Sequence, residues 1–410
     1  MSQADAMDPA SGLPSGVQLT PLDAKFQHDP HPVLDKLRER AAVHHDDVFH
    51  RWFLTRHDDI ETLLKDRSLS VDPRKAADGT YMRLFGDIEG DREPSMLFQD
   101  APTHTRLRGL VNKAFTPRAV EEMRPRIGEI VDELLDAVDG KEGFDLIAAF
   151  AGPLPTIVIA EMLGVDPEDR ADFKRWSDEG VKAFNPLLTD EERGRVMAAG
   201  EAMEAYLRTT IAERKDARRD DLISSLVAVE EGGETLSTDE VATMCGLLLA
   251  AGNVTTTDLI GNGVLALLQH PQELRKLRDD PSLIENAVEE MLRYDSPVTQ
   301  TGRIATSDVT LDGCPISQGQ SIVTSLAAAN HDPSVYPEPH TFDITRKDTH
   351  HQSFGGGSHY CLGAPVARLE AQIGVDTLVR RFPNLRLADE PLEYRRIPVF
   401  RGLVRLPVLI

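Results

Sequence analysis

Residues 354–363 read Phe354-Gly355-Gly356-Gly357-Ser358-His359-Tyr360-Cys361-Leu362-Gly363 and present one cysteine on a glycine-rich loop. Glycine lacks a Cβ, so this loop can adopt unusual backbone angles and bring main-chain N–H groups close to the sulfur. The next residues, 364–370, are typical of a helix start, and Pro365 is tolerated there because a first-turn N–H has no partner inside the helix. We therefore expect Cys361 at a helix N-terminus, where the helix dipole favours a thiolate and lowers the thiol pKa.

A lone cysteine is usually a buried structural residue, and the alternative here is a metal ligand. Six residue types at fixed spacing decide between them, because they would coincide by chance about once in ten million starting positions. They are Phe354, Gly355, Gly357, His359, Cys361 and Gly363. The arrangement resembles the haem-binding loop of the cytochrome P-450 family. That resemblance implies haem b as cofactor, Cys361 as the axial iron ligand, and a thiolate that favours O–O cleavage.

The overall composition fits a soluble protein that does not bind nucleic acid. There are 45 basic and 68 acidic residues, a formal charge of -23, which disfavours contact with phosphates. The N-terminal residues lack a signal-peptide pattern, and no uncharged apolar run reaches 18 residues, so we expect a cytoplasmic protein without a membrane segment. Cys245 and Cys314 are expected to be structural, since the three cysteines have no CxxC spacing.

Helical periodicity dominates the chain, and strand-like alternation is sparse. Helices are predicted near 30–41, 57–66, 104–113, 117–138, 146–163, 167–185, 189–215, 237–269 and 282–294, and strands near 51–55, 304–311, 321–325 and 401–408. No repeat or long linker divides the chain, so we expect a flexible segment over 1–20 and one mainly α domain with small β-sheets over 21–410. The resemblance implies the cytochrome P-450 fold, with haem buried between a long oxygen-binding helix and the cysteine-loop helix.

Glu290 and Arg293 lie three residues apart, so on a helix they share a face and can form an ion pair. An isolated pair of this kind is normally exposed and contributes little to stability. The Glu-x-x-Arg helix is, however, a second motif of the resembled family. It implies that Glu290 and Arg293 are structural and lock the core together with residues 330–333 and 336–342.

Haem has two propionates, and carboxylates are best held by arginine or histidine. His104 and Arg108 are spaced to share one helical face. Arg303 and His359 stand where the resembled family places propionate ligands. These four residues are the predicted propionate partners.

Small residues and threonines interrupt the apolar run from 247 to 258, and such a helix can bend and open a groove. It resembles the oxygen-binding helix of the family, with Ala251 and Gly252 over the iron and Thr255 as the alcohol that steadies bound dioxygen. The family usually has an acid just before this threonine, whereas this chain has Val254. Protons must then use water, Thr255, Thr256 or another acid, and Asp258 is one candidate.

Matching to the family predicts an apolar substrate pocket, which suits a hydrophobic molecule such as a terpenoid, fatty acid or aromatic. Its residues are Leu247, Ala250, Ala251, Thr255, Val298, Phe85, Leu97 and Phe400. The resemblance implies a monomeric bacterial monooxygenase that takes electrons from NAD(P)H through a ferredoxin reductase and a ferredoxin. Because such ferredoxins are acidic, Arg368 is the predicted contact on the cysteine side.

Two alternatives remain at this point. The missing acid at position 254 keeps open a haem-thiolate binding or sensor protein without turnover. A cysteine hydrolase using Cys361 with His359 or His351 as base is the second, although neither an orienting acid nor an oxyanion site is evident in the sequence.

Overall fold

The computed structural model describes residues 12–85, 94–113, 115–185, 187–231 and 234–410, and most of these residues are helical. The α-helices are α1 (Ala24–His28), α2 (His31–Arg40), α3 (His57–Lys65), α5 (Thr103–Asn112), α6 (Pro117–Glu122), α7 (Arg124–Asp136), α8 (Pro153–Leu163), α9 (Arg170–Gly180), α10 (Asp190–Asp216), α11 (Leu222–Ala228), α12 (Thr238–Gln269), α13 (Pro271–Asp279), α14 (Ile284–Tyr294), α15 (Leu326–Ala329) and α16 (Ala364–Arg381).

The strands form small sheets. The largest has the order β1 (Val43–Asp46), β2 (Arg51–Leu54), β9 (Ser321–Ser325), β6 (Gln300–Ile304), and its β2–β9 pair is parallel. A second has the order β10 (Arg386–Leu387), β13 (Pro407–Leu409), β3 (Gly143–Asp145). Three pairs complete the set: β11 (Glu393–Tyr394) with β12 (Leu403–Arg405), β4 (Glu230–Glu231) with β5 (Glu234–Thr235), and β7 (Val309–Leu311) with β8 (Cys314–Ile316).

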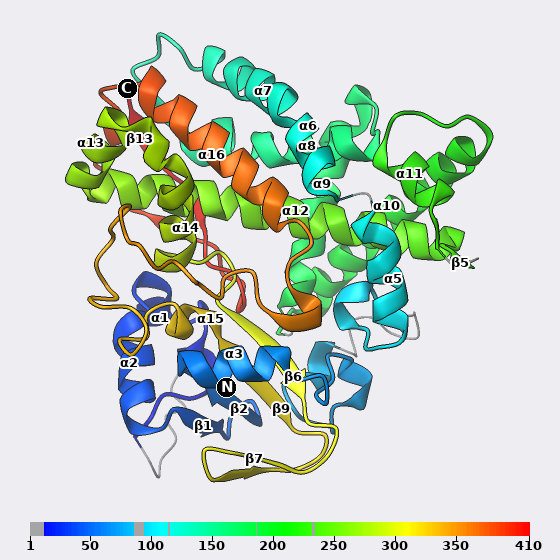
Figure 1. The fold of residues 1–410 in the computed structure, drawn as a ribbon, viewed down its shortest axis with the longest axis vertical. Coiled ribbons are helices and arrows are strands. Elements are labelled where there is room, and N and C mark those ends of the chain that lie inside the picture. The colour runs from blue at the N-terminus through cyan, green and yellow to red at the C-terminus, as the bar shows by residue number, and fades with distance from the viewer. Residues whose placement is uncertain (1–11, 86–93, 114, 186, 232–233) are drawn as a thin grey trace.

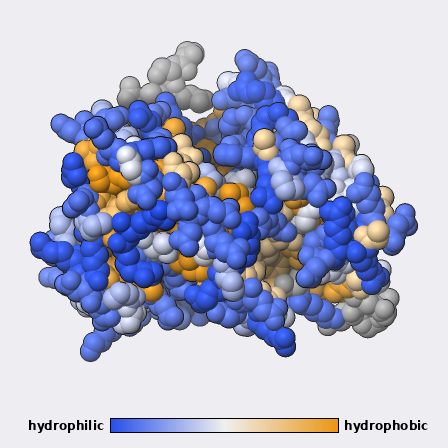
Figure 2. Space-filling model, turned by 90° about the horizontal axis from the view of Figure 1, so that it is seen from above, coloured by the Kyte–Doolittle hydropathy of each residue, from blue (hydrophilic) through white to orange (hydrophobic). Residues whose placement is uncertain are grey.

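Helix α12 is the central element, and in Figure 1 it crosses the molecule between α16 and the four-stranded sheet. It begins at a capping box, in which the Ser237 hydroxyl accepts from the Glu240 N–H and the Glu240 carboxylate accepts from the Ser237 N–H. By length and composition α12 could cross a membrane, but 67% of its most apolar window is buried inside the protein. It is a core helix, and the face of the molecule seen from above in Figure 2 is mostly hydrophilic with smaller apolar patches.

The predicted fold class, mainly α with small sheets, is confirmed. Two boundaries differ for a physical reason. The predicted helix 117–138 is split at Met123, because Pro125 has no N–H with which to continue the hydrogen-bond ladder. The predicted helix 146–163 begins instead as a π-helical turn, Ile147–Ala151, before Pro153 starts α8. Helix α13 and strand β1 were not predicted.

Part of the predicted flexible segment 1–20 falls within the described residues. Residues Gly16–Leu19 form a 3-10 turn whose Leu19 is buried, and the Gly16 N–H donates to Asp46 at the end of β1 at 2.9 Å. Residues 1–11 lie outside the described residues.

Candidate active site

The cysteine loop is held between α3 and α16. Cys361 follows a 3-10 turn, Gly357–His359, and its N–H donates to the Phe354 carbonyl at 3.0 Å. Gly357 has a φ of 64°, and a Cβ there would lie 2.3 Å from the carbonyl oxygen of Leu64 in α3. Only glycine fits that position, so the sequence pattern of the loop is a packing requirement.

The thiol of Cys361 experiences two opposing effects. Burial raises its pKa, whereas N–H groups of Gly363 and Ala364 at the start of α16, and the charge of Arg108, lower it. Burial dominates, so the expected lowering of the pKa is wrong for the polypeptide alone. The helix terminus is oriented as predicted, but a positive partner is needed to favour the thiolate.

A cavity of about 350 Å³ separates the cysteine loop from α12. The α12 residues on its wall recur at helical spacing: Leu247, Leu248, Ala251, Gly252, Thr255, Thr256 and Leu259. Phe85, Leu97, Val298 and Phe400 also line it, as do Phe354, Gly355 and Gly363 around Cys361. Ala250 is the exception among the predicted pocket residues, because its position on α12 points away from this wall.

All four predicted propionate partners also line the cavity. Arg303 is only 5% exposed, and it donates to its neighbouring Gly302 carbonyl at 2.8 Å. The rings of His104 and His359 lie 4.0 Å apart, and burial together with His104 lowers the pKa of His359 to about 3. Both histidines are therefore hydrogen-bonding groups, and Arg108 and Arg303 carry the charge.

The arginines fit a negatively charged ligand. Within the described residues, neither Arg108 nor Arg303 has a carboxylate at ion-pair distance, and burial lowers the pKa of Arg303 to about 10. A buried guanidinium without an anion is costly, so the cavity wall favours a ligand that brings carboxylates. A haem, with two propionates and an iron that binds thiolate, meets both requirements.

Comparisons with known proteins agree with this geometry. Residues 50–396 match the family model described as cytochrome P-450. The chain belongs to the cytochrome P-450 family. It is 44% identical to cytochrome P-450 CYP107DY1 of Priestia megaterium, over 87% of this chain and 89% of the relative. It is 42% identical to the vitamin D(3) 25-hydroxylase of Pseudonocardia autotrophica, over 93% and 94%.

A solved structure is equally similar. The crystal structure of P450BioI with an acyl carrier protein carrying hexadec-9Z-enoic acid has a TM-score of 0.87 and 39% identity, covering 94% of this chain and 99% of that one. The protein is therefore a bacterial-type cytochrome P-450 monooxygenase, an oxidoreductase, and its family implies haem-thiolate ligation.

On the oxygen side of this cytochrome P-450, the Thr255 hydroxyl donates to the Ala251 carbonyl at 2.6 Å. Val254 does not face the cavity and packs in an apolar cluster with Val181, Ile397 and Phe400. A carboxylate at position 254 would be buried among these side chains. The valine thus fills a hydrophobic space, in which burial of a carboxylate would cost free energy.

Asp258, the alternative acid, is also directed elsewhere. It is fully buried, receives hydrogen bonds from Arg395 in the segment after β11, and is not part of the cavity wall. Burial raises its pKa to about 7. Its partner and position indicate that Asp258 ties α12 to the C-terminal segment and does not reach the cavity wall on which Thr255 lies.

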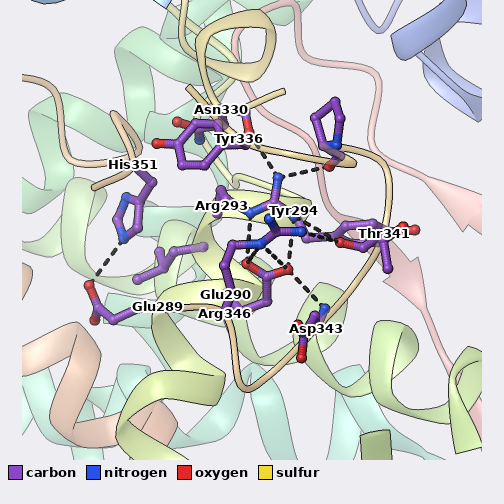
Figure 3. Close-up of polar contacts among 12 residues, drawn as sticks. Glu289, Glu290, Arg293, Tyr294, Asn330, Tyr336, Thr341, Asp343, Arg346 and His351 are labelled. Atoms are coloured by element: carbon purple, nitrogen blue, oxygen red, sulfur yellow. Dashed lines mark hydrogen bonds and ion pairs between the residues drawn. The ribbon is translucent and has the colours of Figure 1, made fainter. Parts of the chain in front are cut away.

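Glu290 and Arg293 form a fully buried ion pair at 2.7 Å, so an exposed surface pair is excluded (Figure 3). The Arg293 guanidinium also donates to three carbonyls, and Glu290 accepts from the Asp343 N–H at 2.9 Å. The carbonyls belong to Asn330, Pro339 and Thr341. The pair therefore joins α14 to the two segments that the sequence indicated.

A second ion pair supports the cysteine loop. Arg368 of α16 donates to both oxygens of Glu289 at 2.6 and 2.8 Å, and its guanidinium lies 4.5 Å from the centre of the Phe354 ring. These contacts, together with a bond from His351, lower the pKa of Glu289 to about 2. Arg368, the predicted ferredoxin contact, is thus paired with Glu289, and its side chain is 27% exposed.

Glu370 was missed by the sequence reasoning. It lines the cavity from α16, is 3% exposed, and its Oε2 has no hydrogen-bond partner within the described part of the chain. Burial raises its pKa well above the usual value. Helical spacing could have revealed it, because Glu370 follows Val366 by four residues and therefore lies on the same buried face.

Proposed function

We propose that this cytochrome P-450 inserts one oxygen atom of O2 into a hydrophobic small molecule bound between α12 and the cysteine loop. The observation that carries the proposal is that one apolar cavity is lined both by a cysteine thiol and by two arginines, Arg108 and Arg303, that have no carboxylate partner within the described part of the chain. Cys361 would bind the iron of haem b, and Arg108, Arg303, His104 and His359 would bind its propionates. The bound haem would supply the chemistry that activates O2.

The residues of α12 are proposed to shape the reaction. Ala251 and Gly252 have no side chain beyond a methyl group, so they leave room above the cysteine. The Thr255 hydroxyl lies on the same wall and can both accept and donate a hydrogen bond, which allows it to pass a proton from ordered water. Because Val254 and Asp258 do not face the cavity, water and Thr255 form the proposed proton route.

The proposed substrate is a terpenoid, fatty acid or aromatic compound. Phe85, Leu97, Leu247, Val298 and Phe400 give the wall an apolar surface. The amide of Gln300, a polar group on the wall, already donates to Tyr81 and to the Pro398 carbonyl. The relatives named above act on vitamin D(3) or bind a fatty acyl chain, which fits an apolar pocket of variable shape.

We further propose a cytoplasmic monomer that receives electrons singly from NAD(P)H through a ferredoxin reductase and a ferredoxin. The ferredoxin is proposed to dock on the face of the cysteine loop, which gives the shortest path to Cys361. Since Arg368 is paired with Glu289, other cations must supply the basic contacts.

One experiment tests the proposal in two steps. The purified protein should show the red-shifted ferrous carbon monoxide band of haem-thiolate, and members of an apolar compound panel should displace the ferric water ligand. Addition of ferredoxin, its reductase and NAD(P)H should then yield a product heavier by one oxygen. Absence of the band contradicts haem-thiolate ligation, whereas substrate binding without product in any redox system favours the sensor alternative.

A further inference from the structure

Three histidines from distant parts of the chain converge outside the active site. His31 begins α2, His331 follows α15, and His340 lies in the segment that receives hydrogen bonds from Arg293. One ring nitrogen of each lies within 4.8 Å of the others. The His31 and His331 rings are 3.7 Å apart, and those of His331 and His340 are 5.1 Å apart.

The hydrogen bonds of this cluster direct two lone pairs toward each other. The Nε2 of His331 lies 2.9 Å from the Tyr294 carbonyl, which can only accept, so Nε2 carries the proton and Nδ1 has a lone pair. The Nε2 of His340 likewise lies 2.8 Å from the Asp35 carboxylate. The two Nδ1 atoms are 3.1 Å apart. A second proton on His340 or a cation between the rings must therefore stabilise this contact.

The third histidine favours the cation. Nδ1 of His31 is buried and has no hydrogen-bond partner among the described residues. A proton shared between His331 and His340 would leave this nitrogen unsatisfied, whereas a metal ion can bind all three rings.

We propose that His31, His331 and His340 form a binding site for a divalent d-block cation, Zn²⁺ being the ion that best fits. In a tetrahedral zinc site with Zn–N bonds of about 2.0–2.1 Å, neighbouring nitrogens lie about 3.4 Å apart, close to the 3.1 Å between the Nδ1 atoms of His331 and His340. The His31 ring is stacked 3.7 Å from that of His331 and would tilt outward to bind the same ion. Asp35 and the Tyr294 carbonyl would orient the rings, as outer hydrogen-bond partners do in known zinc sites. The fourth position would be left for water.

Three arginines close to the site disfavour added positive charge, and this effect is reduced because each of them has its own carboxylate partner. The pairs are Arg38 with Asp35, Arg293 with Glu290, and Arg401 with Asp295. The His340 side chain is 47% exposed and provides a path for the ion from solvent. A bound ion would join α2 to the segments after α15.

The test is zinc binding by untagged holoprotein that has first been stripped with a chelator. Calorimetric titration should give one tight site per chain, and zinc should raise the thermal unfolding temperature. His340→Ala, a change at an exposed position, should weaken this binding at least about a hundred-fold and abolish the thermal shift. Asp35→Asn should weaken it about 10- to 100-fold.

The matched control is His45→Ala, because His45 also bonds an aspartate, Asp47, at 2.7 Å but lies outside the cluster. It should bind zinc as the unmodified protein does. The carbon monoxide spectrum of each variant shows whether the haem-loaded fold is intact. Equal zinc binding by the unmodified protein and His340→Ala, or no stoichiometric site in the unmodified protein, overturns the proposal and favours a proton shared between His331 and His340.

Discussion

The two walls of the cavity are built by different interactions. On the cysteine side, directional contacts dominate: Glu290 with Arg293, Glu289 with Arg368, and the Cys361 N–H with Phe354. On the α12 side the wall is mostly apolar, and Thr255 bonds only to a carbonyl of its own helix among the described residues. Ion pairs and backbone bonds require particular residues at particular positions, whereas apolar packing requires only approximate volume and shape.

This difference agrees with a family in which similar proteins take different molecules: one relative is named a vitamin D(3) 25-hydroxylase, and P450BioI binds an acyl carrier protein carrying a fatty acyl chain. The cysteine wall must hold one thiol in one place for any substrate. The α12 wall can change shape without breaking a polar bond. Substitutions on the cysteine wall should therefore reduce haem binding or stability, whereas substitutions on the α12 wall should mainly change turnover.

The largest effect is expected for Cys361→Ala. It removes the only cysteine sulfur on the wall of the described cavity, so the haem-thiolate carbon monoxide band should disappear completely. Cys314→Ala is the control, because the Cys314 sulfur faces the Val43 carbonyl in another part of the molecule, and its spectrum should be unchanged. A retained thiolate band in Cys361→Ala would contradict the assignment of the ligand.

Arg293→Ala should be the most damaging change beyond the ligand itself. It removes the shorter of the two arginine contacts of buried Glu290, leaving Arg346 at 3.2 Å, and it removes donors from three carbonyls, a loss of up to about 3–5 kcal/mol in the free energy of unfolding. The variant should fail to accumulate as haem protein. Arg124→Ala is the matched control, since Arg124 forms the same i,i+3 pair with Glu121 on the surface and should cost less than about 1 kcal/mol. Similar haem yields for the two variants would show that burial of the pair is unimportant.

The cysteine wall was the more predictable of the two. Gly357 recurs in the motif because a Cβ would collide with Leu64, and Glu290 and Arg293 are spaced by the helix period. Both constraints are local in the sequence. The expectation for the Cys361 pKa failed because burial depends on how the whole chain packs around the sulfur.

The other errors share that cause. The ion pairs of Arg368 and Asp258 were not predicted, because Glu289 lies 79 residues from Arg368 along the chain and Arg395 lies 137 residues from Asp258. Ala250 is adjacent in sequence to the pocket residue Ala251 but lies on another face of α12. The orientation of α12 about its own axis determines which face lines the pocket, and the sequence alone does not give that orientation. Pairing over long sequence separations is set by the tertiary fold, so it is absent from local patterns.

Glu370→Gln should have a smaller effect, and one that depends on pH. Burial raises the pKa of Glu370 in the folded state. Between the pKa of the unfolded state and this higher pKa, the Glu370 carboxyl is protonated in the folded protein and ionised in the unfolded chain. The unmodified protein is then destabilised by rising pH, by at most about 1.4 kcal/mol per pH unit from this group. Glutamine cannot ionise, so the stability of the variant relative to the unmodified protein should increase from pH 5 to pH 8 in chemical denaturation. A constant difference over this range would show that Glu370 has an ordinary pKa.

The smallest effect on stability, but a specific one on turnover, is expected for Thr255→Val. Valine has nearly the same shape, and the hydroxyl that it replaces bonds only within α12 among the described residues, so unfolding should change by less than about 1 kcal/mol. If water and Thr255 deliver protons, however, a smaller share of the electrons should reach product and a several-fold larger share should appear as hydrogen peroxide. Thr257→Val is the matched control, because the Thr257 hydroxyl makes the same bond, to the Asn253 carbonyl at 3.0 Å, away from the cavity. The peroxide released per NAD(P)H should rise for Thr255→Val alone. An equal rise in both variants would indicate a general loosening of α12. No rise in either variant would place the proton route elsewhere on the cavity wall.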